Sequence, residues 1–218
     1  MATPVIALHN LCFCYPQQPA ILQQLDFKLY SGEKVALTGA NGSGKSTLLH
    51  LLLGLQQPSA GEIIIFGQRH ETEADFVKIR GRVGLLLQDA DDQLFCPTVV
   101  EDVAFGPLNL GKTQREAREI VDTTLNLLGL QHYATKITYK LSGGEKRLVA
   151  LATVLAMQPE VLLLDEPTAG LDEATEQRVI DLLRTLPQAM LIVSHDNNFL
   201  QQVTQRTVKL IDGKLLNL

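Results

Sequence analysis

Residues 39–46, Gly-Ala-Asn-Gly-Ser-Gly-Lys-Ser, have the types and the spacing that bind phosphate. They fit the pattern G-x-x-x-x-G-K-[ST], in which glycines let the backbone curl so that its N–H groups point inward at an anion. Lys45 would reach the outer phosphates of a nucleotide, and the Ser46 hydroxyl would bind Mg²⁺. We expect the nucleotide phosphates to contact Gly39, Ala40, Asn41, Gly42, Ser43, Gly44, Lys45, Ser46 and Thr47.

The sequence around this loop supports the interpretation. An apolar run at residues 35–38 predicts a strand before the loop, and leucines between residues 48 and 53 predict a helix after it. The N-terminus of such a helix adds its dipole to the attraction for phosphate. The alternative is a glycine-rich turn before a buried helix, which the match at every fixed position disfavours.

Two adjacent carboxylates follow a second apolar run, residues 161–164. At the C-terminal end of a parallel strand, Asp165 and Glu166 would face the crevice where α/β folds bind ligands. Asp165 would hold Mg²⁺ directly or through water, and Glu166 would polarise an attacking water. The alternative, two solvated carboxylates that cap a strand, is disfavoured by the phosphate loop elsewhere in the chain.

A third apolar run, residues 190–193, leads to Ser194 and His195. A lone histidine at such a place is usually a surface or capping residue. At the tip of another core strand, a neutral imidazole can also donate a hydrogen bond to a phosphate oxygen. His195 is therefore a candidate sensor of the γ-phosphate.

The elements that position these residues predict an α/β fold with a mainly parallel sheet, because apolar runs alternate with helical periodicity. Several runs are apolar at nearly every position, as expected of strands covered on both faces. From about residue 89 to residue 156 the pattern is helical without a clear strand. We expect a single domain, 1–218, in which a helical subdomain (89–156) is inserted into an α/β core (1–88 and 157–218) with an N-terminal antiparallel β region.

Composition narrows the classes of function. The 218 residues are 45% hydrophobic, which suits one compact domain, and the net charge of −5 lacks the basic field that nucleic-acid binding usually needs. We therefore expect no nucleic-acid partner. No apolar run approaches the roughly 18–20 residues that span a bilayer, so we expect a cytosolic chain that does not cross a membrane itself. Three cysteines without a CxxC pair indicate neither a disulfide framework nor a zinc site.

Residues 141–147, Leu-Ser-Gly-Gly-Glu-Lys-Arg, resemble the LSGGQ signature of ABC ATPases. Ser142, Gly143 and Gly144 stand at the start of a helical pattern that runs to about Met157, which gives a second helix N-terminus for an anion. The resemblance covers essentially the whole chain and implies a P-loop ATPase core that hydrolyses ATP with Mg²⁺. It also implies that two copies sandwich two ATP molecules head to tail, each between one copy's phosphate loop and the other's Ser142 loop.

The same resemblance implies roles for further residues. Tyr15 matches the aromatic residue that stacks on adenine, and Gln88 matches the glutamine that links Mg²⁺ and the lytic water to the transport partner. Residues 170–172 match the D-loop, and His195 matches the switch histidine. The catalytic set is then Glu166, His195 and Gln88, and the Mg²⁺ ligands are Ser46, Gln88 and Asp165.

One departure from the signature points to a subgroup. Glu145 stands where glutamine is commonest, and closer matches are found in importers of the energy-coupling-factor type, which residues 88–95 and 98–107 also resemble. By itself that stretch predicts a loop and an N-capped helix, with Thr98 paired to Glu101. The resemblance implies a peripheral ATPase on the cytoplasmic face of the cell inner membrane, whose partners are a transmembrane coupling subunit and a substrate-binding membrane subunit.

Within this subgroup the chain resembles the short, self-sufficient ATPases of nickel or cobalt uptake, because every catalytic motif is present and few residues follow His195. A homodimer would then have two competent sites. The solute stays open, since nothing in an ATPase touches the cargo, and a vitamin or another small solute is the alternative.

Two other classes are disfavoured. Soluble ABC ATPases of DNA repair separate their ATPase halves by long coiled coils, for which sustained heptads are missing here, and those of translation generally carry two ATPase domains. A non-enzymatic nucleotide-binding scaffold would have lost catalytic residues, whereas Lys45, Asp165, Glu166 and His195 are all present.

Overall fold

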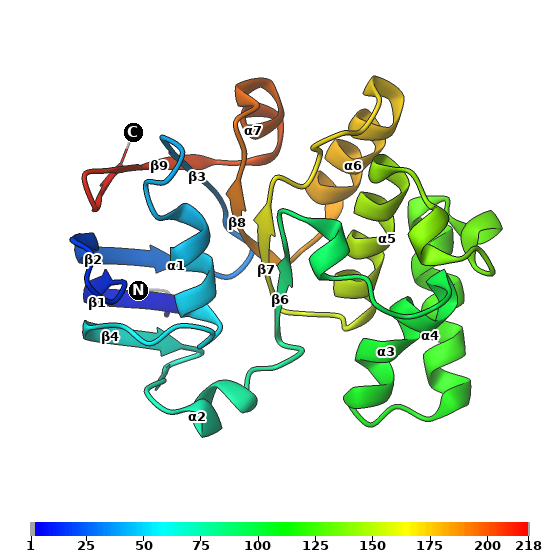
Figure 1. Ribbon diagram of the computed structural model, residues 1–218, viewed down its shortest axis with the longest axis horizontal. Helices are drawn as coiled ribbons and strands as arrows, with labels where there is room; N and C mark the ends of the chain where they lie inside the picture. The colour runs from blue at the N-terminus through cyan, green and yellow to red at the C-terminus, as the bar shows by residue number, and fades with distance from the viewer. Residues whose placement is uncertain (1–2, 218) are drawn as a thin grey trace.

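Two β-sheets and a group of helices make up residues 3–217, the part of the chain that the computed structural model describes (Figure 1). The larger sheet has the order β10-β9-β3-β8-β7-β6. Its strands are parallel except for the antiparallel pair β9–β10. They are β3 (Lys34–Gly39), β6 (Val83–Leu86), β7 (Val161–Asp165), β8 (Ala189–Val193), β9 (Arg206–Ile211) and β10 (Lys214–Asn217).

The smaller sheet is antiparallel, with the order β2-β1-β4-β5. It comprises β1 (Ile6–Cys14), β2 (Ala20–Leu29), β4 (Ala60–Ile65) and β5 (Gln68–Arg69). The expected α/β fold with an N-terminal antiparallel region is therefore confirmed. Between the two sheets lies α1 (Lys45–Leu52), whose leucines pack in one cluster with both (Figure 1).

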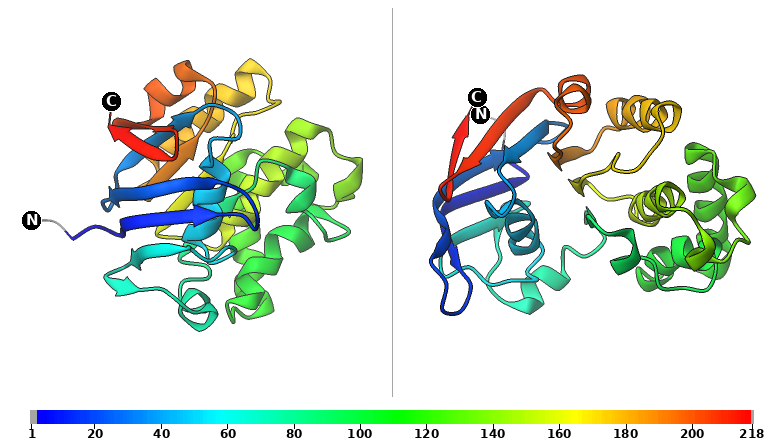
Figure 2. Two further views of the ribbon diagram at one scale, coloured as in Figure 1. Left: turned by 60° about the vertical axis from the view of Figure 1, so that its left-hand side comes forward. Right: turned by 45° about the horizontal axis from the view of Figure 1, so that its top comes forward.

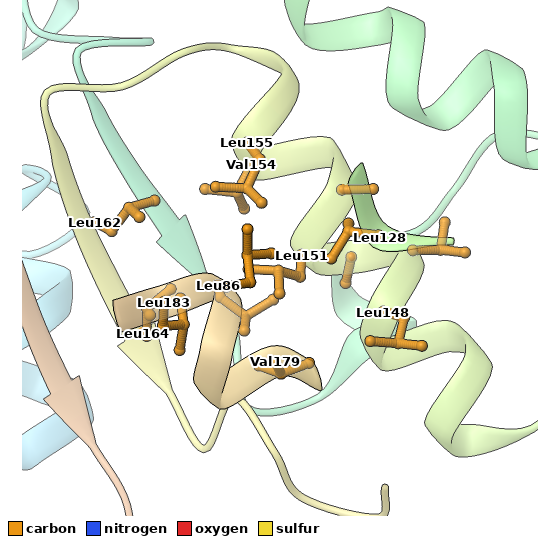
Figure 3. Packing of buried hydrophobic residues seen from close by; sticks show 14 of the residues in the cluster. Leu86, Leu128, Leu148, Leu151, Val154, Leu155, Leu162, Leu164, Val179 and Leu183 are labelled. Atoms are coloured by element: carbon orange, nitrogen blue, oxygen red, sulfur yellow. The ribbon is translucent and has the colours of Figure 1, made fainter. Parts of the chain in front are cut away.

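The apolar runs are explained by burial on both faces of the larger sheet. In β7, Leu162 and Leu164 belong to the cluster that contains the helices, whereas Val161 and Leu163 belong to the cluster with α1. Figure 3 shows Leu162 and Leu164 near side chains of α5 (Gly143–Ala156) and α6 (Glu173–Thr185). Successive side chains of a strand point to opposite faces of the sheet, so a strand covered on both faces needs an apolar residue at every position.

The remaining helices are α2 (Glu73–Val77), α3 (Val99–Asn109), α4 (Gln114–Leu128) and α7 (Asn197–Val203), with short 3₁₀ turns at Ala90–Asp92, Gln131–Tyr133 and Thr138–Lys140. Figure 2 shows α3 and α4 at the end of the molecule that is farthest from the antiparallel sheet. The helical region shares its core with the sheet, since Val121 of α4 and Leu162 of β7 lie in one cluster. The subdomain boundaries at residues 88 and 157 stay a prediction.

Candidate active site

The phosphate loop joins β3, which ends at Gly39, to α1, which begins at Lys45. Two of its glycines have backbone conformations that side chains rarely adopt, with φ of 151° at Gly39 and 105° at Gly44. An added Cβ would lie 2.6 Å from the Leu210 carbonyl oxygen at Gly39 and 2.5 Å from Ile21 Cγ2 at Gly44. Backbone conformation and space therefore both require glycine at these positions.

Two polar groups of this loop fit a phosphate. The buried Lys45 donates through Nζ to the carbonyl oxygens of Gly39 and Ala40, both at 2.9 Å, so its ammonium group lies against its own loop. The buried Oγ of Ser43 has no hydrogen-bond partner within the described chain. A phosphate oxygen would supply acceptors to both groups.

The start of α1 and the end of β7 meet through a hydrogen bond. Ser46 Oγ donates to Asp165 Oδ2 at 2.7 Å, although the two residues are 119 positions apart. A hydroxyl and a carboxylate oxygen are the hard ligands that Mg²⁺ prefers, so this donor set fits that ion. Gln88 follows β6, the parallel neighbour of β7, and therefore leaves the sheet at the same edge as Asp165.

Glu166 and His195 are also brought together. The carboxylate oxygen Oε2 of Glu166 accepts hydrogen bonds from Ser194 Oγ at 3.1 Å and from the His195 backbone N–H at 3.4 Å. The other oxygen, Oε1, lies 3.6 Å from His195 Nε2 and has no hydrogen-bond partner among the described residues. This arrangement leaves one carboxylate oxygen able to accept a proton from water.

Tyr15 stands beside the helix that carries the phosphate loop. Its hydroxyl is 3.1 Å from Thr47 Oγ1, and its ring packs edge-on against Phe13 with centroids 4.8 Å apart. The half-buried ring is therefore held next to α1, where it can stack on a base.

The signature residues cap α5. Ser142 is the N-cap; its Oγ accepts from the Glu145 N–H at 3.3 Å, and Glu145 Oε2 accepts from the Ser142 N–H at 2.7 Å. Hydrogen bonds from the Ser142 N–H and the Tyr133 side chain lower the pKa of the Glu145 carboxyl to about 2. Lys136 Nζ lies 3.6 Å from the same carboxylate. Glutamate at this position thus completes a capping box that orders Ser142.

The structure does not bring the signature to the phosphate loop of the same chain. The leucines of α1 pack in the cluster on one face of the larger sheet, and the apolar residues of α5 pack in the cluster on the other. Figure 1 shows the two helices separated by β7 and β8. The expectation that Ser142 contacts ATP held by a second copy is compatible with this placement and stays a prediction.

Comparison with known proteins decides the family. The model of the ABC transporter family matches residues 22–169, which include the phosphate loop, the signature and both strand-end carboxylates. The chain belongs to the ABC transporter ATPases. It is an ATPase, and the resemblance of its sequence to the ABC ATPases is confirmed.

Individual ABC proteins show how far this similarity extends. A Brucella suis protein, provisionally named an ABC transporter ATP-binding protein, is 55% identical over 90% of this chain and 82% of its own length. The energy-coupling factor transporter ATP-binding protein EcfA of Methanothermobacter thermautotrophicus is 44% identical over 97% of this chain and 70% of its own length.

Two solved ABC structures share the fold. CbiO1 from Clostridium perfringens, described as part of the ABC transporter complex cbiONQ, is 33% identical with a TM-score of 0.87 over 98% of this chain and 87% of that one. A dimeric ATP-binding cassette in a post-hydrolysis state, bound to ADP and Pi, is 27% identical with a TM-score of 0.88 over 96% of both chains.

Sequence reasoning missed two residues of this ABC site, Arg147 and Ser194. Ser194 donates to the Glu166 carboxylate, and the buried Arg147 donates to the backbone carbonyls of Asp165 and Glu166. One signal was available for Arg147, because it falls on the same helical face as Ala150 and Leu151, which are buried. A charged residue on an apolar helix face indicates specific buried partners.

Proposed function

We propose that this ABC ATPase energises an importer of the energy-coupling-factor type, as a homodimer bound peripherally to a membrane coupling subunit. The observation that carries the proposal is an exposed apolar surface on the segment after Gln88. Phe95 is 66% exposed and Phe105 45% exposed, and their rings pack edge-on at 4.7 Å. With Leu108 and Leu110, also exposed, we call these four residues the α3 surface.

The α3 surface is suited to a protein partner, because exposed aromatic side chains such as the contacting pair Phe95 and Phe105 are enriched at interaction sites. Its position also suits coupling, since the segment begins directly after Gln88, at the sheet edge that carries Asp165. Among residues 3–217, no helix has the length and apolar character needed to cross a membrane. In the proposed assembly, a separate transmembrane subunit supplies the helices and covers the α3 surface, and a substrate-binding membrane subunit captures the solute.

At the nucleotide, Tyr15 stacks on adenine and the phosphate loop binds the phosphates with Lys45. Ser46, Asp165 and Gln88 would hold Mg²⁺, which neutralises charge on the phosphate oxygens when bound. Glu166 accepts a proton from the attacking water, and His195 donates to the γ-phosphate. Phosphoryl transfer depends mainly on such positioning and electrostatics.

In the proposed dimer, Ser142, Gly143 and Gly144 of each copy contact the ATP of the other. Support comes from their position at the N-terminus of α5, which favours anions, and from the separation of α1 and α5 within one chain. We propose nickel or cobalt as the solute, on the resemblance described above, with a vitamin or another small solute as the competing cargo.

The test is to tag the chain in its source cells, solubilise the membranes gently and identify co-purifying proteins by mass spectrometry. A polytopic coupling subunit together with a metal-binding membrane protein supports the importer and its cargo. A vitamin-binding membrane subunit would overturn only the proposal that the solute is nickel or cobalt. Ribosomal or DNA-associated proteins without a membrane partner would overturn the importer and leave the ATPase intact.

A matched pair of variants tests whether the α3 surface makes the contact. Phe105→Ser should abolish recovery of the coupling subunit. Leu216→Ser changes a residue that is 49% exposed on β10 and should leave recovery unchanged. Equal recovery with both variants would show that the partner binds elsewhere.

A further inference from the structure

Arg147 of α5 is a buried cation whose hydrogen bonds within residues 3–217 end on backbone carbonyl oxygens. It is 3% exposed. Nη2 donates to the carbonyls of Asp165 at 3.1 Å and Glu166 at 2.6 Å, and Nη1 donates to the carbonyl of Leu87. A guanidinium presents its N–H groups in one rigid plane, so these bonds fix three peptide groups relative to one another.

Glu166 has a backbone conformation that needs support. Its φ is 51°, in the left-handed region that residues other than glycine seldom occupy. The carbonyl of Asp165 belongs to the peptide before the Glu166 Cα, and the carbonyl of Glu166 belongs to the peptide after it. Because Arg147 binds both carbonyl groups, one side chain holds the two peptide planes whose rotations about the Glu166 Cα define φ and ψ.

The carboxylate of Glu166 is held separately. Ser194 Oγ and the His195 N–H donate to Oε2, and the Glu166 N–H donates to the Val193 carbonyl at 2.8 Å. These contacts come from the end of β8, whereas Arg147 approaches from α5. The direction in which Oε1 points therefore depends on α5 as well as on the sheet.

We propose that Arg147 is a positioning residue for hydrolysis: it holds Glu166 in its left-handed conformation and so directs the carboxylate at the attacking water. The hydrogen bond to the Leu87 carbonyl also fixes the peptide group before Gln88 relative to Glu166. The inference rests on the proposed role of Glu166. Arg147 itself touches neither nucleotide nor water in this mechanism.

Two substitutions of Arg147 test the idea through the ATPase activity of the purified full chain. Arg147→Met keeps the apolar stem and removes every donor, and should lower kcat about 10- to 100-fold, since a misplacement of about 1 Å costs on the order of 100-fold in rate. KM and the affinity for ATP should change less than about threefold, because Arg147 does not contact the nucleotide. Arg147→Lys keeps a charged donor and should give an intermediate kcat.

Lys34 offers a matched control. It is also a buried cation, 5% exposed, and its Nζ donates to the carbonyls of Leu183 and Arg184, both at 2.7 Å. These carbonyls lie at the C-terminal end of α6, away from the nucleotide site. Lys34→Met should lower the unfolding temperature and leave kcat unchanged.

A double mutant separates positioning from general stability. In a Glu166→Gln background, single-turnover hydrolysis followed over hours should change less than about twofold when Arg147→Met is added, because the two residues act as a unit. Unchanged kcat in a folded Arg147 variant, or an equal loss in both backgrounds, would overturn the inference. If Arg147→Met does not fold, the same comparison is made with Arg147→Lys. A wild-type chain without ATPase activity would defeat the proposed mechanism as well, whereas an active wild type with unaffected variants defeats the Arg147 inference alone.

Discussion

Asp102, in the first turn of α3, is a buried carboxylate that joins two distant segments of the chain. It is 3% exposed. Its Oδ1 accepts from the backbone N–H groups of Phe95 at 3.1 Å and Cys96 at 3.0 Å, and its Oδ2 accepts from Thr138 Oγ1 at 3.1 Å. One side chain thus ties the loop that bears Phe95 to the turn that leads into the signature.

Replacing Asp102 by alanine removes all three acceptor contacts. A hydrogen bond to a charged group contributes about 1.5–3 kcal/mol, and an unsatisfied buried donor costs about 1–3 kcal/mol. Water can reach the partly buried N–H groups of Phe95 and Cys96, whereas the Thr138 hydroxyl stays buried. We therefore expect a loss of about 3 kcal/mol of unfolding free energy. At about 2–4 °C per kcal/mol for a chain of this size, Tm should fall by about 6–12 °C.

Asp102→Asn is the control, because it keeps the shape and one oxygen acceptor for the two N–H groups. Its amide can donate to the Thr138 hydroxyl, so the expected loss is only about 1 kcal/mol, or about 2–4 °C. Thermal melts by circular dichroism without nucleotide, supported by urea titration, measure both. The reasoning fails if the alanine variant melts within about 2 °C of wild type, or if both variants are equally destabilised.

Other predictions concern the nucleotide site and one thiol. Glu166→Gln should keep ATP binding, nearly abolish turnover and trap a dimer on gel filtration; wild-type hydrolysis would remove Glu166 from its role. Lys45→Ala should lose ATP affinity, which unchanged binding by calorimetry would contradict. Tyr15→Ala should weaken adenine binding by about 1–3 kcal/mol, the scale of base–aromatic stacking, and an unmoved affinity would leave Tyr15 a strand-end residue. Burial and the nearby Asp102 raise the pKa of the Cys96 thiol to about 11, so alkylation at pH 8 should be slower at Cys96 than at the exposed Cys14; equal rates by mass spectrometry would refute this.

Much of the fold follows from local patterns. The runs at residues 35–38, 161–164 and 190–193 all lie on strands of the larger sheet, because strands covered on both faces are apolar throughout. Four strands, β2, β5, β9 and β10, were not predicted. In β2 the buried positions Leu22 and Leu25 are three apart, and Gln24 has a positive φ beside a shift in register, so simple alternation is interrupted.

Within the site, local sequence was enough to predict three groups: the phosphate loop, the strand-end carboxylates and the capped signature helix. Each depends on neighbours within a few positions, such as Ser142 and Glu145. The contacts that hold these groups in place are seen only in the folded chain. Arg147 reaches Leu87, 60 positions away, and Asp102 reaches Thr138, 36 positions away. Periodicity and motifs report local conformation and burial, whereas such contacts exist only after the strands have aligned and α5 has packed on one face of the sheet.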